Sequence, residues 1–369
     1  MDIRTTAQLA VLLTAVTFVS PAFAQNYDTK IFNVAVGAAP VEQDTPSFPS
    51  GLRRGQEGWV SVNYVITAEG KVANPVILDS VGGIGFEESA REVVAEWRFE
   101  APGEELANNT TNIRFEIKDG RDLATANFMR RYQGILQHLH YEEHEKARSS
   151  VESTLERGGC NLYASTMLWL MVGRVDGAEG NNAGKLEHYR RALGVSNRNS
   201  LADDDLRDLL VKMFTLEMEL SQYAAAKSTL NRLTVLPGSE PQLAEMREQI
   251  ADLDKQLDGD APLAAEARLF NPCNASEGEP LWSYTPVRQS FSFARLDGNV
   301  ERFEVRCERN RLEGPVKAGK SWALPEDAKN CRVIVFGDDG ASFQFVEHNE
   351  TESPDATAEA AVAKSDVLD

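Results

Sequence analysis

Residues 46–119 show a change of periodicity that few folds can accommodate. Residues 58–66 and 111–117 place apolar side chains at every second position, which is typical of strands with one buried face. Between them, residues 86–96 repeat apolar side chains at intervals of three and four, which is typical of a helix that covers such a face. Residues 72–79 read as a further strand. The sequence therefore predicts a small β-β-α-β domain with one helix packed on a three-stranded sheet.

The order of several residues in this domain resembles the C-terminal domain of the TonB family. The matching positions are Phe48-Pro49, Gly58, Val60, Gly70, Ser80, Phe86, Ala90, Trp97-Arg98-Phe99 and Pro102. The family usually has Tyr where Phe48 stands, and its Ser-Ser-Gly corner is here Ser80-Val81-Gly82 after Asp79. The resemblance implies that the domain docks a short peptide from an outer-membrane transport receptor by strand addition. It also implies that Pro46, Phe48 and Pro49 lie beside that peptide.

The last strand of the predicted sheet, residues 111–117, is expected to leave one edge open. An open edge presents unpaired N–H and C=O groups, which favour an added strand. Asn112, Arg114 and Glu116 would point outward there and select the partner peptide. In the alternative interpretation, Pro46 and Pro49 only stiffen the start of the domain, and helical repeats shield the edge.

Charge and motifs argue against several function classes. The net charge is −19 at pH 7 with no basic cluster, so nucleic acid and an anionic membrane surface are unfavourable partners. Gly82-Gly83-Ile84-Gly85 lacks the spacing of a phosphate-binding loop, and we interpret it as a tight corner before the helix. His138, His140 and His144 are interpreted as a surface turn. The sequence thus predicts no catalytic residue, no metal site, no cofactor and no enzyme activity.

Residues 1–24 are typical of a secretory signal peptide. An apolar run from Leu9 to Val19 precedes Ala22-Phe23-Ala24, which predicts cleavage after Ala24. The alternative is an uncleaved inner-membrane anchor, although the run is shorter than a membrane span. If the family resemblance holds, the exported protein is periplasmic. Residues 25–45 are expected to form a polar, irregular lead-in.

The middle of the chain, residues 120–258, has the periodicity of helix hairpins that recur about every forty residues and stack on one another. Two stretches, residues 187–193 and 222–226, resemble degenerate tetratricopeptide repeats. We therefore predict a helical repeat domain with a tetratricopeptide-like arrangement.

Residues 265–348 change to a period of two and predict a small all-β domain with two hairpins, joined at Asp297-Gly298-Asn299 and at residues 337–340. Cys307 and Cys331 adjoin predicted neighbouring strands in phase with core residues, so an exported chain is expected to bridge them. The pairing of Cys160 and Cys273 stays open. Residues 349–369 are acidic and lack aromatic residues, which predicts a disordered tail.

Taken together, these features predict an α+β multidomain protein that binds a protein or peptide partner in the periplasm. The first reading is a link to an outer-membrane receptor and to transmembrane transport. The alternative is a structural or assembly adaptor of the envelope that has kept the fold without energy transduction. The long spacer and membrane helix of full TonB transducers are not recognisable in the sequence, and that observation favours the adaptor.

Overall fold

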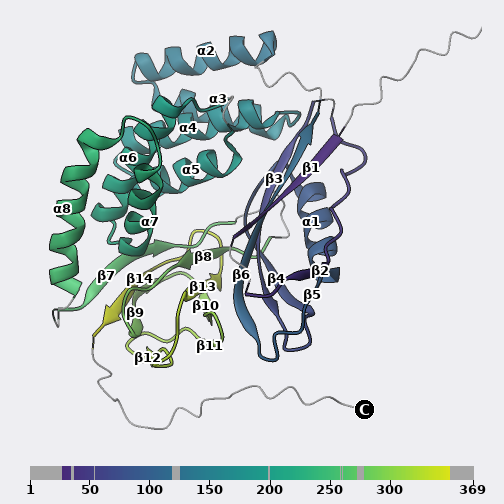
Figure 1. Ribbon diagram of the computed structural model, residues 1–369. Helices are drawn as coiled ribbons and strands as arrows, with labels where there is room; N and C mark the ends of the chain where they lie inside the picture. Colours follow the sequence, from purple (N-terminus) through teal and green to yellow (C-terminus); the bar gives the residue numbers. More distant parts are fainter. Residues whose placement is uncertain are drawn as a thin grey trace, which may run out of the picture.

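The computed structural model describes residues 27–34, 37–53, 55–118, 125–197, 200–257, 259, 261–271 and 278–349 (Figure 1). The predicted signal peptide, Cys273 and the tail after residue 349 lie outside these ranges. The described chain is a mixed α+β structure in which helices and antiparallel sheets both occur, in agreement with the predicted fold class.

The N-terminal part is a four-stranded antiparallel sheet with one helix on one face. The strand order is β1-β6-β3-β4. The elements are β1 (Tyr27–Val34), β3 (Gly58–Ile66), β4 (Val72–Val81), α1 (Ile84–Glu96) and β6 (Leu106–Ile117), with a small ribbon of β2 (Pro40–Glu42) and β5 (Arg98–Phe99) beside them. Helix α1 packs on a core that contains Val60, Phe86 and Phe115, as the two periodicities predict.

The corner before α1 depends on glycine. Gly82 and Gly83 have φ values of 117° and 108°, in the region that residues with a side chain rarely adopt. A Cβ atom at Gly82 would lie 2.8 Å from the carbonyl oxygen of Glu57. The predicted tight corner is therefore present, and it brings the start of α1 close to the segment that precedes β3.

The middle part is a right-to-left series of packed helices, seen at the upper left of Figure 1. In the described residues they are α2 (Ala126–His140), α3 (His144–Glu156), α4 (Leu162–Ala178), α5 (Asn182–Val195), α6 (Asp203–Glu219), α7 (Tyr223–Thr234) and α8 (Glu240–Leu257). They pack as hairpins α2–α3, α4–α5 and α6–α7, each hairpin contacts the next, and α8 packs on α7. The stacked hairpins agree with the predicted spacing of about forty residues.

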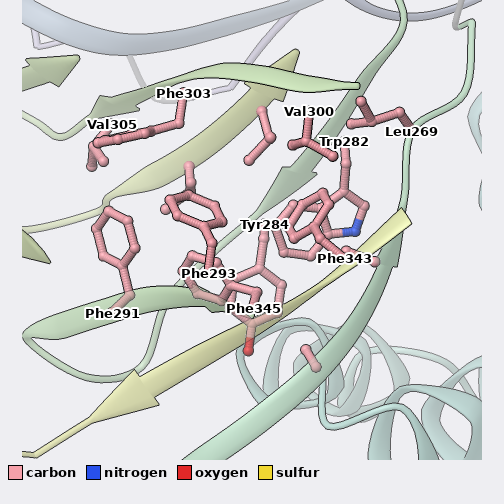
Figure 2. Packing of buried hydrophobic residues seen from close by; sticks show 14 of the residues in the cluster. Leu269, Trp282, Tyr284, Phe291, Phe293, Val300, Phe303, Val305, Phe343 and Phe345 are labelled. Atoms are coloured by element: carbon pink, nitrogen blue, oxygen red, sulfur yellow. The ribbon is translucent and has the colours of Figure 1, made fainter. Parts of the chain in front are cut away.

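The C-terminal part is a sandwich of two four-stranded antiparallel sheets. One sheet has the order β11-β10-β13-β8 and the other β12-β9-β14-β7. Their strands are β7 (Leu263–Arg268), β8 (Leu281–Tyr284), β9 (Ser290–Asp297), β10 (Val300–Arg306), β11 (Arg311–Pro315), β12 (Ser321–Ala323), β13 (Arg332–Gly337) and β14 (Ser342–His348). Aromatic side chains from both sheets fill the space between them, as Figure 2 shows. The rings of Phe293 and Phe303, one from each sheet, have centroids 5.4 Å apart.

The two predicted hairpins of this part are wrong in their pairing. Strands β9 and β10 flank the turn at Gly298 but belong to different sheets, and the same is true of β13 and β14. Each turn therefore carries the chain from one sheet to the other. The predicted disulfide is present: Cys307 follows β10, Cys331 precedes its antiparallel neighbour β13, and their sulfur atoms are 2.08 Å apart.

Candidate partner-binding edge

Strand β6 lies inside the N-terminal sheet, so the predicted open edge at Thr111–Ile117 is wrong. It pairs with β3 on one side and with β1 on the other, from Tyr27 opposite Ile117 to Val34 opposite Thr110. The expectation that residues 25–45 are irregular is therefore wrong for Tyr27–Val34, which form β1. Residues 29–34 are rich in β-branched and aromatic side chains, which was the signal available for β1.

The edge of the sheet is β1 itself. In the part of the chain that the structure describes, β1 has a strand neighbour on one side only. Tyr27 and Phe32 are 46% and 47% exposed, one on each face of the strand. Ile31 packs against the core beneath α1. Lys30 forms an ion pair with Glu116 across the β1–β6 pair. Strand β1 is therefore held to the core through Ile31, while the rings of Tyr27 and Phe32 stay partly exposed.

The opposite end of the sheet is covered by the C-terminal sandwich. Val76 and Leu78 of β4 pack against Leu281, Ile334 and Phe336. These apolar contacts occupy the face of β4 that points away from α1. Both β1 and β4 are outer strands, but residues 27–32 of β1 are all exposed or half-buried, whereas β4 is mostly buried from residue 77 onward, so β1 is the more exposed of the two.

Of the three predicted outward residues of β6, Arg114 and Asn112 lie beside helix α5, and Glu116 pairs with Lys30 of β1. Arg114 donates hydrogen bonds to the carbonyl oxygens of Gly194, at 2.9 Å, and of Ser196, both at the end of α5. Burial lowers the pKa of Arg114, while Glu116 and Glu57 act in the opposite direction. Asn112 lies opposite Phe32 in the register, and both line a cleft beside α5. Arg114 therefore joins the sheet to the helical hairpins, and a role of these three residues in choosing a partner stays a prediction.

The predicted residues at the start of the domain lie on the other face of the sheet. Pro46 is buried, and Phe48 stacks on Tyr27 of β1 with ring centroids 4.0 Å apart. Phe48 also meets Phe86 edge to face at 5.5 Å. Pro49 approaches the first turn of α1 so closely that a Cβ atom at Gly85 would lie 3.1 Å from it. The structure thus brings Phe48 to the β1 edge, but on the side away from Arg114.

Glu57 connects the sheet to the helices, although no sequence pattern indicates this role. Its carboxylate accepts hydrogen bonds from the backbone N–H groups of Ile117 and Leu162, both at 2.8 Å. Leu162 is the first residue of α4, where a negative charge is favourable to the helix dipole. Glu57 is 8% exposed. A single acidic residue before a strand carries no such signal in the sequence, because its partners are set by tertiary structure.

The described residues contain no group of three or more His, Cys, Asp or Glu side chains placed to hold a metal ion. His138 contacts Glu143 at 2.6 Å, at the bend between α2 and α3. None of the described helices combines the length and the apolar character that a membrane span requires.

Comparisons with known proteins agree with the domain. Residues 46–118 match the family described as Gram-negative bacterial TonB protein C-terminal. Protein TonB of Pseudomonas aeruginosa is 34% identical over 80 residues, which cover 21% of this chain and 23% of that protein. Protein TonB of Yersinia enterocolitica is 34% identical over 86 residues, which cover 23% of this chain and 33% of that protein. The chain therefore spans only a quarter to a third of these relatives' length.

One solved structure belongs with these relatives. The solution NMR structure of the Pseudomonas aeruginosa TonB CTD is 31% identical, and the match covers 22% of this chain and 87% of that one, with a TM-score of 0.20.

Proposed function

Residues 46–118 form a TonB C-terminal domain, and from that premise we propose that this is a non-enzymatic protein-binding protein of the cell envelope. Its N-terminal sheet accepts an extended segment of a partner protein, such as an outer-membrane receptor involved in transmembrane transport. The observation that carries this proposal is the accessible outer edge of β1 in a sheet that is otherwise covered on both faces.

The partner segment pairs with β1 and leaves β6 paired as it is. A strand with a neighbour on one side only presents a row of N–H and C=O groups that an extended peptide can satisfy. Addition at this edge breaks no existing hydrogen bond, whereas addition to β6 requires the eight residues of β1 to leave. Tyr27 and Phe32, one on each face, contribute exposed aromatic surface to alternate side chains of the incoming strand.

The remaining parts serve as a scaffold that fixes the sheet. The helical hairpins, which we interpret as tetratricopeptide-like, bind Arg114 through the end of α5. The sandwich covers β4 on the same face. A sheet held in this way presents the outer edge of β1 in a fixed orientation, which reduces the ordering cost of binding.

We place the mature protein in the periplasm, with the signal peptide cleaved after Ala24. The apolar run and the Ala22-x-Ala24 pattern support this location, as does the family of the domain. An inner-membrane protein that retains residues 1–24 is the alternative.

A second candidate function is an adaptor for envelope structure or assembly. It is favoured by β1, because the chain itself fills the edge of β6 and so completes the sheet of this domain. In that case the helical hairpins would carry the main partner surface, and the β1 edge would bind nothing.

Photo-crosslinking in intact cells separates the two functions. A photoreactive phenylalanine analogue replaces Tyr27 or Phe32, and the matched control places it at Tyr141, which is 64% exposed on the turn between α2 and α3. We expect both β1 positions to crosslink one extended segment of an outer-membrane protein, identified by peptide sequencing, and Tyr141 to give none. Crosslinks from Tyr141 alone would support the adaptor and contradict strand addition.

A further inference from the structure

A cleft of about 1230 Å³ lies where the N-terminal sheet, helices α5–α7 and the C-terminal sandwich meet. Its volume exceeds that of most small-molecule sites. Residues from all three parts line it, among them Leu78, Leu186 and Ser283. Because the three parts are separate in the sequence, no local motif predicts this cleft.

Arg332, the first residue of β13, is an unpaired cation on the wall of the cleft. Its Nε atom is buried and has no hydrogen-bond partner among the described residues. Its Nη1 atom makes one long contact, 3.4 Å from the hydroxyl oxygen of Ser283. Burial, together with the positive charges of Arg190 and Arg306, lowers the pKa of Arg332 to about 10. A half-buried arginine whose Nε–H group is buried and unsatisfied, and which has no counter-charge, is costly, so it calls for a partner.

The nearby charges do not supply that partner. Arg190 of α5, which also lines the cleft, pairs with Glu217 at 3.0 Å. The same carboxylate accepts a hydrogen bond from Thr229 at 2.7 Å and acts on Arg232 of α7. The Glu217 carboxylate thus faces two positive charges, those of Arg190 and Arg232. Among the described contacts it forms no hydrogen bond with Arg332.

The other neighbour of Arg332 is already neutralised. Arg306 stands opposite Arg332 in the β10–β13 register and pairs with Glu304 at 2.7 Å. Its remaining hydrogen bonds go to the N-terminal sheet and not into the cleft. The excess positive charge around Arg332 is notable in a chain whose net charge is −19.

We propose that this cleft binds a small ligand through an oxyanion, a carboxylate or phosphate group, held by Arg332 and Arg190. Arginine's planar fork fits both kinds of oxyanion with two parallel hydrogen bonds. The hydroxyl group of Ser283 supplies a further donor at the same wall. Water could satisfy the Nε–H group but would leave the charge unbalanced, which is why an anion fits this site better.

The test uses the full exported chain and measures binding of labelled phosphate and labelled succinate by equilibrium dialysis, at constant ionic strength set with chloride. We expect saturable binding of at least one anion, and the two arms decide between phosphate and carboxylate. Arg332→Gln should weaken that binding by about ten-fold or more, the loss expected for one charged hydrogen-bonded contact. The matched control, Arg295→Gln, changes a side chain that is 76% exposed and should leave it unchanged.

Two further variants keep the result decisive. Arg332→Lys keeps the charge and loses the fork, so it should bind more weakly than the parent and more tightly than Arg332→Gln. If Arg332→Gln fails to fold, Arg190→Gln reports on the same site from α5. Absence of saturable binding in the parent, or equal affinity in the parent and in the folded Arg332 or Arg190 variant, would overturn the proposal. Neither result depends on the partner edge at β1.

Discussion

Arg306 donates a hydrogen bond from Nη1 to the side-chain oxygen of Asn63, at 3.0 Å, although 243 residues separate them in the chain. Arg306 is completely buried, and Nη1 also donates to the carbonyl oxygen of Asn74 at 3.0 Å. Asn63 in turn donates to Asn108 at 2.8 Å. A single guanidinium thereby fastens the C-terminal sandwich to strands β3 and β4 of the TonB C-terminal domain.

Replacing this guanidinium should loosen that junction. We expect Arg306→Met to lower the free energy of unfolding by about 3–5 kcal/mol, because it breaks a buried ion pair and leaves Glu304 partly uncompensated. Urea unfolding followed by tryptophan fluorescence measures the change. Arg309→Met, at a side chain that is 58% exposed, is the matched control and should change stability by less than about 0.5 kcal/mol. Equal effects of the two variants would contradict the role of Arg306.

The Cys307–Cys331 disulfide should stabilise the sandwich. The bridge spans a sequence separation of 24 residues, for which loop-closure entropy gives about 3 kcal/mol. We expect the Cys307→Ala/Cys331→Ala variant to unfold at a correspondingly lower urea concentration than the parent. Cys160→Ala is the control, since Cys160 forms no disulfide with any residue that the structure describes. Non-reducing peptide mapping that recovers both thiols free in the native protein would contradict the bridge.

A covalent lock on β1 distinguishes addition at its outer edge from its displacement. Phe32 and Asn112 lie opposite each other in the β1–β6 register, so the double cysteine variant, with Cys160→Ser, can be oxidised across the pair. We expect the oxidised variant to bind the segment recovered by crosslinking within about two-fold of its reduced form, because the outer edge stays accessible.

Displacement of β1 by the partner predicts the opposite result for the oxidised variant. If the partner replaces β1, oxidation should abolish binding and reduction should restore it. The parent chain treated with the same reductant controls for opening of the native disulfide.

Asp176 should make the helical stack sensitive to acid. It is 1% exposed and contacts Arg148 at 2.8 Å and His188 at 2.5 Å, which joins α3, α4 and α5. Burial alone would raise the pKa of Asp176, but the hydrogen bonds from His188 and Arg148 outweigh it and lower the pKa below its ordinary 3.8. A carboxyl with a lowered pKa in the folded state stabilises it above that ordinary value, and the contribution is lost as the pH falls through the folded pKa.

Asp176 and Glu179 both pair with Arg148, so variants of these two carboxylates form a matched pair. Asp176→Asn should cost about 2 kcal/mol at pH 7, a value typical of hydrogen bonds to a charged group, and should flatten the loss of stability below pH 4. Glu179→Gln removes the exposed partner of Arg148 and should cost less than about 1 kcal/mol. Urea unfolding between pH 3 and pH 7 measures both. A parent and an Asp176→Asn variant with parallel pH profiles would contradict the prediction.

Export can be tested on the native protein by mass spectrometry. We expect the first residue to be Gln25, or its pyroglutamate, because Ala22-x-Ala24 is a cleavage pattern. A protein that retains residues 1–24 in the membrane fraction would support the anchored alternative.

The elements with strong periodicity were predictable, and the junctions between distant parts were not. Strand β3 and helix α1 follow from alternating and three-to-four patterns that each lie within one segment. Strand β1 was missed because its few apolar residues do not alternate, since Ile31 and Phe32 are adjacent, and polar residues separate them from Tyr27. The turn at Gly298 was recognised, but a glycine turn does not reveal whether the strands that it joins share a sheet.

At the candidate sites, too, local pattern indicated which face a side chain occupies but not what that side chain contacts. The alternation in β6 placed Arg114 on the face away from α1, as the structure has it, but only the docking of α5 determines that this face is covered. Likewise, nothing near Arg332 in the sequence indicates that Arg190 lies close to it. Such relationships are set by tertiary packing and not by local pattern.

Pairing along the outer edge of β1 would also have a mechanical consequence. Tension applied along a strand loads all of its ladder hydrogen bonds together, in shear, whereas tension applied across one end breaks them one after another. A segment bound along β1 would therefore resist a lengthwise pull and peel away under a sideways one. The direction of the pull, rather than its size alone, would decide whether such a partner is held or released.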